Sequence, residues 1–403
     1  MKILKDNIHG CLLRAYIYLS HNIKNKNKNK TCIIHGTLNQ DTHILIQSWL
    51  LNNKDIENHL LNNHDYVWRD FADKIKKQNK NLQYIIFPLF SPTEEELLLL
   101  KKNNRIVVNL HTSFSFILFL TLLAKHTVAV IKSFFYLKRL DYFIAYIASI
   151  FNPRFIMSIL IYKQFKTMIK KTYVVLLPWE NHPEQKAICA AFREGGSTVY
   201  GYTHAGTNSV ISLNKVENKI YENAYPEKLF IHSRDIFKAS SYVGWKKEHL
   251  VYIKSQRFLA RSPNDFLGKV FLPYSVDGSL WFLKKIKKMI NDGKICVKEI
   301  KIHPSFVHNE DIKALIKEIS FDDKATNVII YGFTTVVLEA LESGCSVVQY
   351  VENSVGIVDE ITFPSIKKEE IADGVYRLSL HEGKKGNLVN YHEGKELIDY
   401  ICF

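Results

Sequence analysis

The sequence predicts an α/β protein with two Rossmann-like domains, whose parallel sheets face a central cleft. Runs that are apolar at every residue alternate with amphipathic stretches, as expected when parallel strands are joined by helices. The segment QRFLARSPNDFLG interrupts this alternation, and a second series of strands and helices follows it. A chain of 403 residues, 47% of them hydrophobic, is also long enough for two cores. We therefore expect one domain at residues 1–256 and another at 257–403.

The first series begins at Thr31 and contains several buried strands. The stretch SPTEEELLLLKKNN predicts a helix, because its acids and lysines complement the helix dipole at either end. A strand–helix–strand unit follows in TYVVLLPWENHPEQKAICAAFREGGSTVYGY, where a Gly-Gly pair ends the helix. Another such unit lies in EKLFIHSRDIFKASSYVGWKKEHLVYIKS. The four runs that predict the first strands are TCIIHG, LQYIIFPLF, RIVVNLH and TYVVLLP.

The second series repeats the alternation after the linker. Three helices are expected in this series. The first runs from Gly278 to about Asn291, the second lies between the runs VKEIKIHPSF and NVIIYGF, and the third begins at Thr334. The glycine fingerprint GxGxxG is absent, which argues against a dinucleotide-binding protein. The strands of this series are predicted in KVFLPYS, VKEIKIHPSF, NVIIYGF and CSVVQYV.

The charge balance favours anionic partners. The chain has 54 basic and 40 acidic residues, a net charge of +14. Zinc-finger spacing, an aromatic RNA-binding signature and a helix-turn-helix are not found, so nucleic acid is not an expected partner. The region from Thr112 to Ile169 mixes apolar runs with Lys and Arg. Two interpretations of this insertion, about residues 112–170, stay open: buried helices, or a helical surface on the inner face of an anionic membrane.

The cysteines and the apolar runs indicate a cytoplasmic protein, with peripheral association at the inner membrane as an option. The six cysteines show neither CxxC pairs nor Cys/His metal spacing, so we expect reduced thiols and no metal site. The N-terminus lacks the apolar core of a signal peptide. The most apolar run, TSFSFILFLTLLA, is too short to span a bilayer.

Candidate binding residues follow the predicted strands, because ligands of doubly wound sheets bind at the carboxyl ends of the strands. Thr334 is expected to cap a helix and Thr335 to add a first-turn hydroxyl, while Gly332 lets the backbone approach a ligand. A helix N-terminus of this kind binds phosphate, although a plain cap without a ligand is the alternative. His303, at the end of the neighbouring strand, could donate to the same phosphate, and Pro304 would fix its turn.

The segments KIHPSF and YGFTTVVLEALESGCSVV resemble the C-terminal domain of GT-B glycosyltransferases that use CMP-activated sugars. This group includes bacterial sialyltransferases, polysialyltransferases and capsule-type Kdo transferases. The resemblance implies a GT-B-like fold in which His303, Thr334 and Thr335 hold the CMP phosphate. It also implies that Glu339 contacts the donor ribose, with a solvated helix residue as the alternative.

The N-terminal half adds a second resemblance. The segment PWENHPEQKAICAAFREGGSTVYGYTHAG resembles a pattern in bacterial surface-carbohydrate biosynthesis proteins: an acid near a tryptophan, a helix, then a Gly-Tyr-x-His loop. The two resemblances together cover roughly residues 173–351. The chain departs from the family in lacking a clear acid motif of the sialyltransferase type, and in having Thr-Thr where a Ser pair is usual.

Sugar transfer needs a group that activates the acceptor hydroxyl, or a nucleophile. Glu180 is the first candidate because it follows a strand, and we expect the adjacent Trp179 to raise its pKa by desolvation. The alternative is an acid at the start of the next helix. His204 is the second candidate, as acid, base or acceptor ligand, and Asp277 is the third. Further possible cleft residues are His182, Asp235 and Arg257.

The resemblance implies a metal-independent transferase that needs no cofactor besides its donor substrate. It would move a 2-keto acid sugar of the Kdo or sialic-acid type from a CMP donor to a glycan or glycolipid acceptor, as in lipopolysaccharide or capsule. UDP- or GDP-sugar transfer and CDP-glycerol-type transfer are alternatives within the enzymes. A non-catalytic scaffold of the same fold is the alternative outside them. A periplasmic binding protein, which also has two such domains, is not expected, because it would need an export signal and the sequence lacks one.

Overall fold

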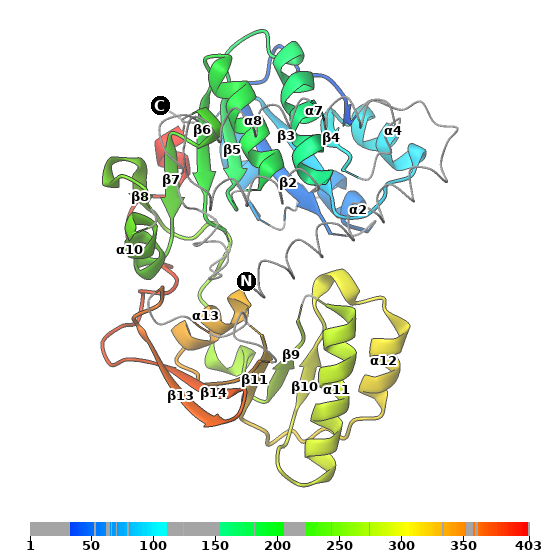
Figure 1. Cartoon of the computed structure of the whole chain (residues 1–403), viewed down its shortest axis with the longest axis vertical. Helices are drawn as coiled ribbons and strands as arrows, with labels where there is room; N and C mark the ends of the chain where they lie inside the picture. Colours follow the sequence, from blue (N-terminus) through cyan, green and yellow to red (C-terminus); the bar gives the residue numbers. More distant parts are fainter. Residues whose placement is uncertain are drawn as a thin grey trace.

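Two β-sheets organise the chain, one in each half of the sequence (Figure 1). The structure is a computed structural model. It describes residues 33–51, 54–61, 65, 67–69, 71–78, 80–110, 124, 153–180, 182–204, 223–242, 244–273, 275–332, 334–351, 358 and 362–401.

The first sheet has eight strands in the order β1-β4-β3-β2-β5-β6-β7-β8. All neighbours pair in parallel except β1, which runs antiparallel to β4. The chain thus builds outward from β2 in one direction and from β5 in the other, so the order reverses between these two strands. The strands are β1 (Ile34–His35), β2 (Ile44–Leu50), β3 (Leu82–Pro88), β4 (Arg105–Val108), β5 (Val174–Pro178), β6 (Thr198–Tyr202), β7 (Lys228–Ile231) and β8 (Leu250–Tyr252).

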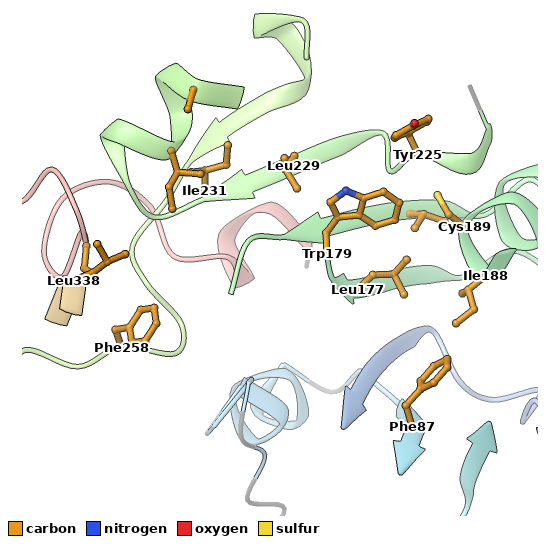
Figure 2. Packing of buried hydrophobic residues seen from close by; sticks show 14 of the residues in the cluster. Phe87, Leu177, Trp179, Ile188, Cys189, Tyr225, Leu229, Ile231, Phe258 and Leu338 are labelled. Carbon is orange, nitrogen blue, oxygen red and sulfur yellow. The ribbon is translucent and has the colours of Figure 1, made fainter. Parts of the chain in front are cut away.

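Helices cover both faces of the first sheet because its strands are apolar on both sides. Leu45 and Leu177 belong to a core shared with α7 and α8, whereas Ile46 and Leu176 belong to a second core shared with α3. Figure 2 shows part of the first core, with Leu177 near side chains of α8. The helices are α2 (Lys54–Leu61), α3 (Phe71–Lys77), α4 (Glu94–Lys102), α7 (Pro153–Met168), α8 (Pro183–Glu194) and α10 (Arg234–Tyr242).

The second sheet has six strands in the order β10-β9-β11-β12-β14-β13. Strands β9 to β12 are parallel, and β13 and β14 form an antiparallel hairpin at one edge. The order reverses between β9 and β11. The elements are β9 (Lys269–Phe271), α11 (Val276–Asn291), β10 (Glu299–Lys301), α12 (Glu310–Lys317), β11 (Val328–Tyr331), α13 (Thr335–Glu342), β12 (Val347–Tyr350), β13 (Ile366–Ala372) and β14 (Val375–Leu380).

The C-terminal segment returns to the first domain. The Glu342 carboxylate of α13 accepts hydrogen bonds from the backbone N–H groups of Gly386 and Leu388, both at 2.7 Å. Asp235 of α10 accepts two bonds from Ser365, at 3.0 Å each, which join the two domains. The chain then ends its described part in α14 (Ile398–Ile401). The residues of this segment that enter the core beside α3 are Leu397, Ile398 and Ile401.

The predicted fold class is confirmed as an α/β protein with two Rossmann-like domains. The expectation of parallel sheets holds for the strands that carry the candidate site, but β1 and the β13–β14 hairpin are antiparallel. Strand β2 was not among the predicted strands. The linker between the sheets spans residues 253–268 and includes the predicted boundary at 256/257; the domain ranges themselves stay a prediction.

The predicted insertion at about 112–170 lies largely outside the described residues. Its last part forms α7, which packs on α8 and places Met157, Ile161 and Phe165 in the core. None of the described helices is both long enough and apolar enough to cross a membrane. Of the cysteines, Cys189, Cys296 and Cys345 are free thiols, and the other three lie outside the described residues.

Candidate active site

Polar side chains follow the carboxyl ends of β5, which borders the reversal point of the first sheet, and of the next two strands, β6 and β7. Glu180 follows β5, His204 follows β6, and His232 follows β7. In Figure 1 these strands point toward the second domain. Ligands of doubly wound sheets bind at such a reversal point. The two catalytic candidates Glu180 and His204 therefore lie where this fold places a site.

The Glu180 carboxylate contacts an imidazole on each of its oxygens. Oε1 lies 3.2 Å from Nε2 of His204, and Oε2 lies 2.9 Å from Nε2 of His182. The Glu180 main-chain N–H donates to Oε1 of Gln185 in the first turn of α8, at 2.9 Å. The backbone and both carboxylate oxygens are thus held in place, as a positioned catalytic group requires.

The pKa of Glu180 lies below its usual value. Burial alone would raise this pKa, but His204, then His182 and Arg257, lower it more. The expectation that Trp179 raises this pKa is wrong. The indole of Trp179 is fully buried in the core near Tyr225 and Leu177, as Figure 2 shows, while the carboxylate sits among cationic and imidazole groups.

His204 is neutral at neutral pH. Burial lowers its pKa to about 4, with Glu180 opposing this shift and Arg257 adding to it. With Nε2 beside a carboxylate, the favoured tautomer carries its proton on Nε2 and leaves a lone pair on Nδ1. Nδ1 is buried and, among the described residues, has no hydrogen-bond partner. The indole of Trp49, at the end of β2, lies against the imidazole with ring centroids 5.0 Å apart.

His232 and Arg257 complete this side of the site. His232 is fully buried, and neither of its ring nitrogens has a hydrogen-bond partner among the residues that the structure describes. Arg257, in the linker, donates from Nη1 to the main-chain carbonyl of His204 at 3.1 Å. His232 was missed in the sequence, although it follows a strand as His204 does.

The second sheet places the predicted phosphate-binding residues at its own reversal point. Thr334 is the N-cap of α13 and Thr335 its first residue, as predicted. Within the described residues, the Thr334 side chain makes no capping hydrogen bond, and its buried Oγ1 has no partner. Gly332 has φ +69°, and a Cβ placed there would meet nothing within 4 Å among the described residues. Within the described part of the chain, the space beside Gly332 is therefore unfilled.

His303 lies one strand away from the reversal point. It follows β10, and Pro304 begins a 3-10 turn that ends at Phe306, whose ring lies 5.9 Å from the imidazole. Burial, and then the positive charge of Arg257, lower the pKa of His303 to about 4. His303 is therefore neutral at neutral pH and offers a hydrogen bond rather than a charge.

The remaining candidates differ in their surroundings. Glu339 is buried in α13, so the alternative of a solvated helix residue is wrong. Its Oε2 lies 3.7 Å from Nη1 of Arg261, and burial raises its pKa although Arg261, Arg257 and Arg69 oppose this. Asp277 is exposed in the first turn of α11, and no ion pair or hydrogen bond among the described residues joins it to Glu180 or His204.

Within the described part of the chain, no group of three or more His, Cys, Asp or Glu side chains could hold a metal ion. The site chemistry that the described residues offer is acid–base catalysis, hydrogen bonding and positive charge from arginine.

No protein-family model and no curated protein matches the sequence. Among solved structures, the chain is similar to HepE of Anabaena in complex with UDP and glucose, at 10% identity and TM-score 0.33, over 77% of this chain and 80% of that one. The HepE complex with UDP-glucose gives 8% identity and TM-score 0.32, over 77% and 79% of the two chains. TM-scores this low carry no argument about function, so the following proposal rests on the residues of the site.

Proposed function

We propose that this protein is a glycosyltransferase that uses a nucleotide-activated sugar. One observation carries the proposal. The carboxylate–imidazole pair Glu180–His204 lies beside the reversal point of one sheet, and the helix N-terminus that carries Thr334 lies at that of the other. The first arrangement suits an acceptor hydroxyl and the second suits a phosphate.

In the proposed reaction, His204 takes the proton of the acceptor hydroxyl. Its Nδ1 has a lone pair but no hydrogen-bond partner in the described part of the chain, and a hydroxyl of a bound acceptor would supply such a hydrogen bond. Glu180 holds Nε2–H and stabilises the imidazolium that forms as the hydroxyl oxygen attacks the sugar. Glu180, the first candidate from the sequence, thus becomes a positioning group for His204, the second.

The departing nucleotide would be held in the second domain. Thr334, Thr335 and the N–H groups at the start of α13 would donate to phosphate oxygens, and His303 would add a neutral hydrogen bond. Glu339, in the same helix, would accept a hydrogen bond from a ribose hydroxyl. Asp277 stays a candidate carboxylate without a partner in the cluster.

The proposed donor is a CMP-activated sugar of the 2-keto acid type, and the acceptor a bacterial surface glycan. The His-Pro and Thr-Thr motifs support this choice through their resemblance to CMP-sugar users. A UDP-sugar is the alternative donor. A scaffold of the same fold is the alternative to an enzyme.

The test measures nucleotide binding and donor turnover separately. CMP, UMP, UDP and GDP are compared by thermal shift, where a ligand at one hundred times its Kd adds about 2.7 kcal/mol to stability. We expect the largest shift with CMP. A larger shift with UDP or GDP would replace the donor class, and the absence of any shift would favour the scaffold.

Glu180→Gln tests the chemistry. The change preserves shape but removes the charge that orients His204, so turnover of a CMP-sugar should fall about 100-fold or more, while CMP affinity stays nearly constant. Glu194→Gln is the matched control, because Glu194 is exposed at the far end of α8 and pairs with Lys166. Normal turnover in Glu180→Gln would dismiss the Glu180–His204 pair as the catalytic centre.

A further inference from the structure

Three neighbouring strands of the first sheet bring an aromatic side chain to the proposed acceptor side of the site. Strands β2, β5 and β6 are consecutive in the sheet and run in parallel, so their carboxyl ends lie at one edge. Trp49 is the next-to-last residue of β2, Glu180 lies two residues beyond β5, and His204 two residues beyond β6. The reversal point lies between β2 and β5. Trp49 therefore stands where a sheet of this kind binds its ligand.

The imidazole of His204 joins this indole to the catalytic pair. Its Nε2 lies 3.2 Å from Oε1 of Glu180, and its ring lies against the indole of Trp49, with centroids 5.0 Å apart and ring planes inclined by 42°. Its buried Nδ1 has no hydrogen-bond partner among the described residues. The separation of the two rings is comparable to the width of a sugar ring. A sugar whose hydroxyl bonds to Nδ1 would therefore have its ring carbons within reach of the indole.

Trp49 differs from the tryptophans that fill the cores of this domain. Trp68 and Trp179 are fully buried, and Trp245 is 5% exposed. Trp49 is only half-buried, although its strand lies between β3 and β5 and its backbone pairs with Phe87 of β3. A large aromatic side chain that keeps exposed surface on a fixed backbone loses little freedom when a ligand covers it. The position of Trp49 thus suits contact with a ligand.

We propose that Trp49 is the platform on which the acceptor sugar stacks, so that the acceptor group is a pyranose with an apolar face and not a simple aliphatic alcohol. The C–H bonds on one face of a pyranose form an apolar, slightly positive patch, and the face of an indole is negative. His204 can bond to any hydroxyl, whereas the indole selects the ring that carries it. Only the sugar's role as the acceptor of a transfer rests on the proposed function; the sugar contact itself does not.

The experiment measures binding of methyl β-glucopyranoside, methyl β-galactopyranoside and methyl α-mannopyranoside to the full chain by saturation-transfer NMR, with glycerol as the alcohol that has no ring. We expect at least one glycoside to bind, with saturation strongest at the C–H protons of one face, and glycerol not to bind. Trp49→Leu should weaken the glycoside about 10-fold, and Trp49→Phe, which retains an aromatic face, should fall between. Trp281→Leu is the matched control, because it removes an exposed indole on α11, and its affinity should equal wild type.

A second readout separates a platform from mere packing against His204. With a nucleotide sugar that the wild type turns over, Trp49→Leu should raise the KM of the glycoside about 10-fold and leave hydrolysis of the donor by water unchanged, because water does not stack. An equal loss of transfer and hydrolysis would overturn the platform, as would wild-type glycoside affinity in Trp49→Leu, or a wild type that binds glycerol as tightly as the glycosides or binds no glycoside. Glycoside binding that depends on Trp49, in a protein that turns over neither CMP-sugars nor UDP-sugars, would support the sugar site while rejecting the transferase.

Discussion

Replacing His232 with Phe should make the protein markedly less sensitive to acid. His232 is fully buried between Tyr202 and Phe258, whose ring centroids lie 5.8 and 5.2 Å away. Burial, then the charges of Arg257 and His204, lower its pKa to about 3. A phenyl ring fits this aromatic surrounding and cannot be protonated.

The direction in which stability changes with pH follows from the difference between the folded-state and unfolded-state pKa values of each histidine. The unfolded chain binds protons at the ordinary value of 6.5, whereas the folded chain resists protonation down to about 3 at His232 and about 4 at His204. Stability is therefore fully present above pH 6.5 and falls as the pH drops below it. At pH 5, each histidine lowers the free energy of unfolding by about 2 kcal/mol relative to pH 7.5, and the two together lower it by about 4 kcal/mol.

Urea unfolding at pH 7.5 and pH 5, followed by tryptophan fluorescence, measures this loss. His232→Phe should reduce the loss between the two pH values by about 2 kcal/mol. His308→Gln, at an exposed position, should leave it as in the wild type. A loss that is unchanged in His232→Phe within about 0.5 kcal/mol would refute the reasoning, because His232 would then titrate equally in the folded and unfolded chains.

Two further predictions concern α13. Glu342→Gln replaces a carboxylate oxygen that accepts from Gly386 by an NH2 group, so it should lower the free energy of unfolding by about 2 kcal/mol in urea titrations. A change below about 0.5 kcal/mol would mean that the C-terminal segment is held by other contacts. Thr334→Val removes a hydroxyl that makes no capping hydrogen bond to the described residues, so stability should change by less than about 1 kcal/mol. The same variant should weaken CMP binding about 10-fold in calorimetry, and equal affinity would remove Thr334 from the site.

The sequence was sufficient for the strands whose residues are apolar throughout. Strand β2 was not predicted because Gln47, Ser48 and Trp49 interrupt its apolar run, although Gln47 and Ser48 are fully buried in the structure. These polar side chains are buried because β2 lies between β3 and β5 in the sheet. The local sequence pattern does not show which strands will flank β2. The β13–β14 hairpin did carry a signal, because the dipeptide Asp373-Gly374 that joins its strands is typical of a hairpin turn.

The candidate site was predictable where a residue follows a strand. Glu180, His204 and Thr334 were found by that rule, and the same rule applied to the segment FIHS would have found His232. The contact between Glu180 and His204, in contrast, could not be predicted from the sequence. Glu180 lies 3.2 Å from His204 only because β5 and β6 are neighbours in the sheet, and that contact decides which group is a base and which positions it.

The return of the C-terminal segment has a consequence for biosynthesis. Leu397, Ile398 and Ile401 fill part of the core beneath the first sheet, some 145 positions after that sheet's last strand. Domains generally fold in order as they leave the ribosome. The core of the first domain therefore cannot be completed, and part of its apolar surface stays exposed, until the whole second domain has been translated. We expect ribosome-bound chains that stop before residue 397 to bind chaperones through that surface, and longer ones to release them.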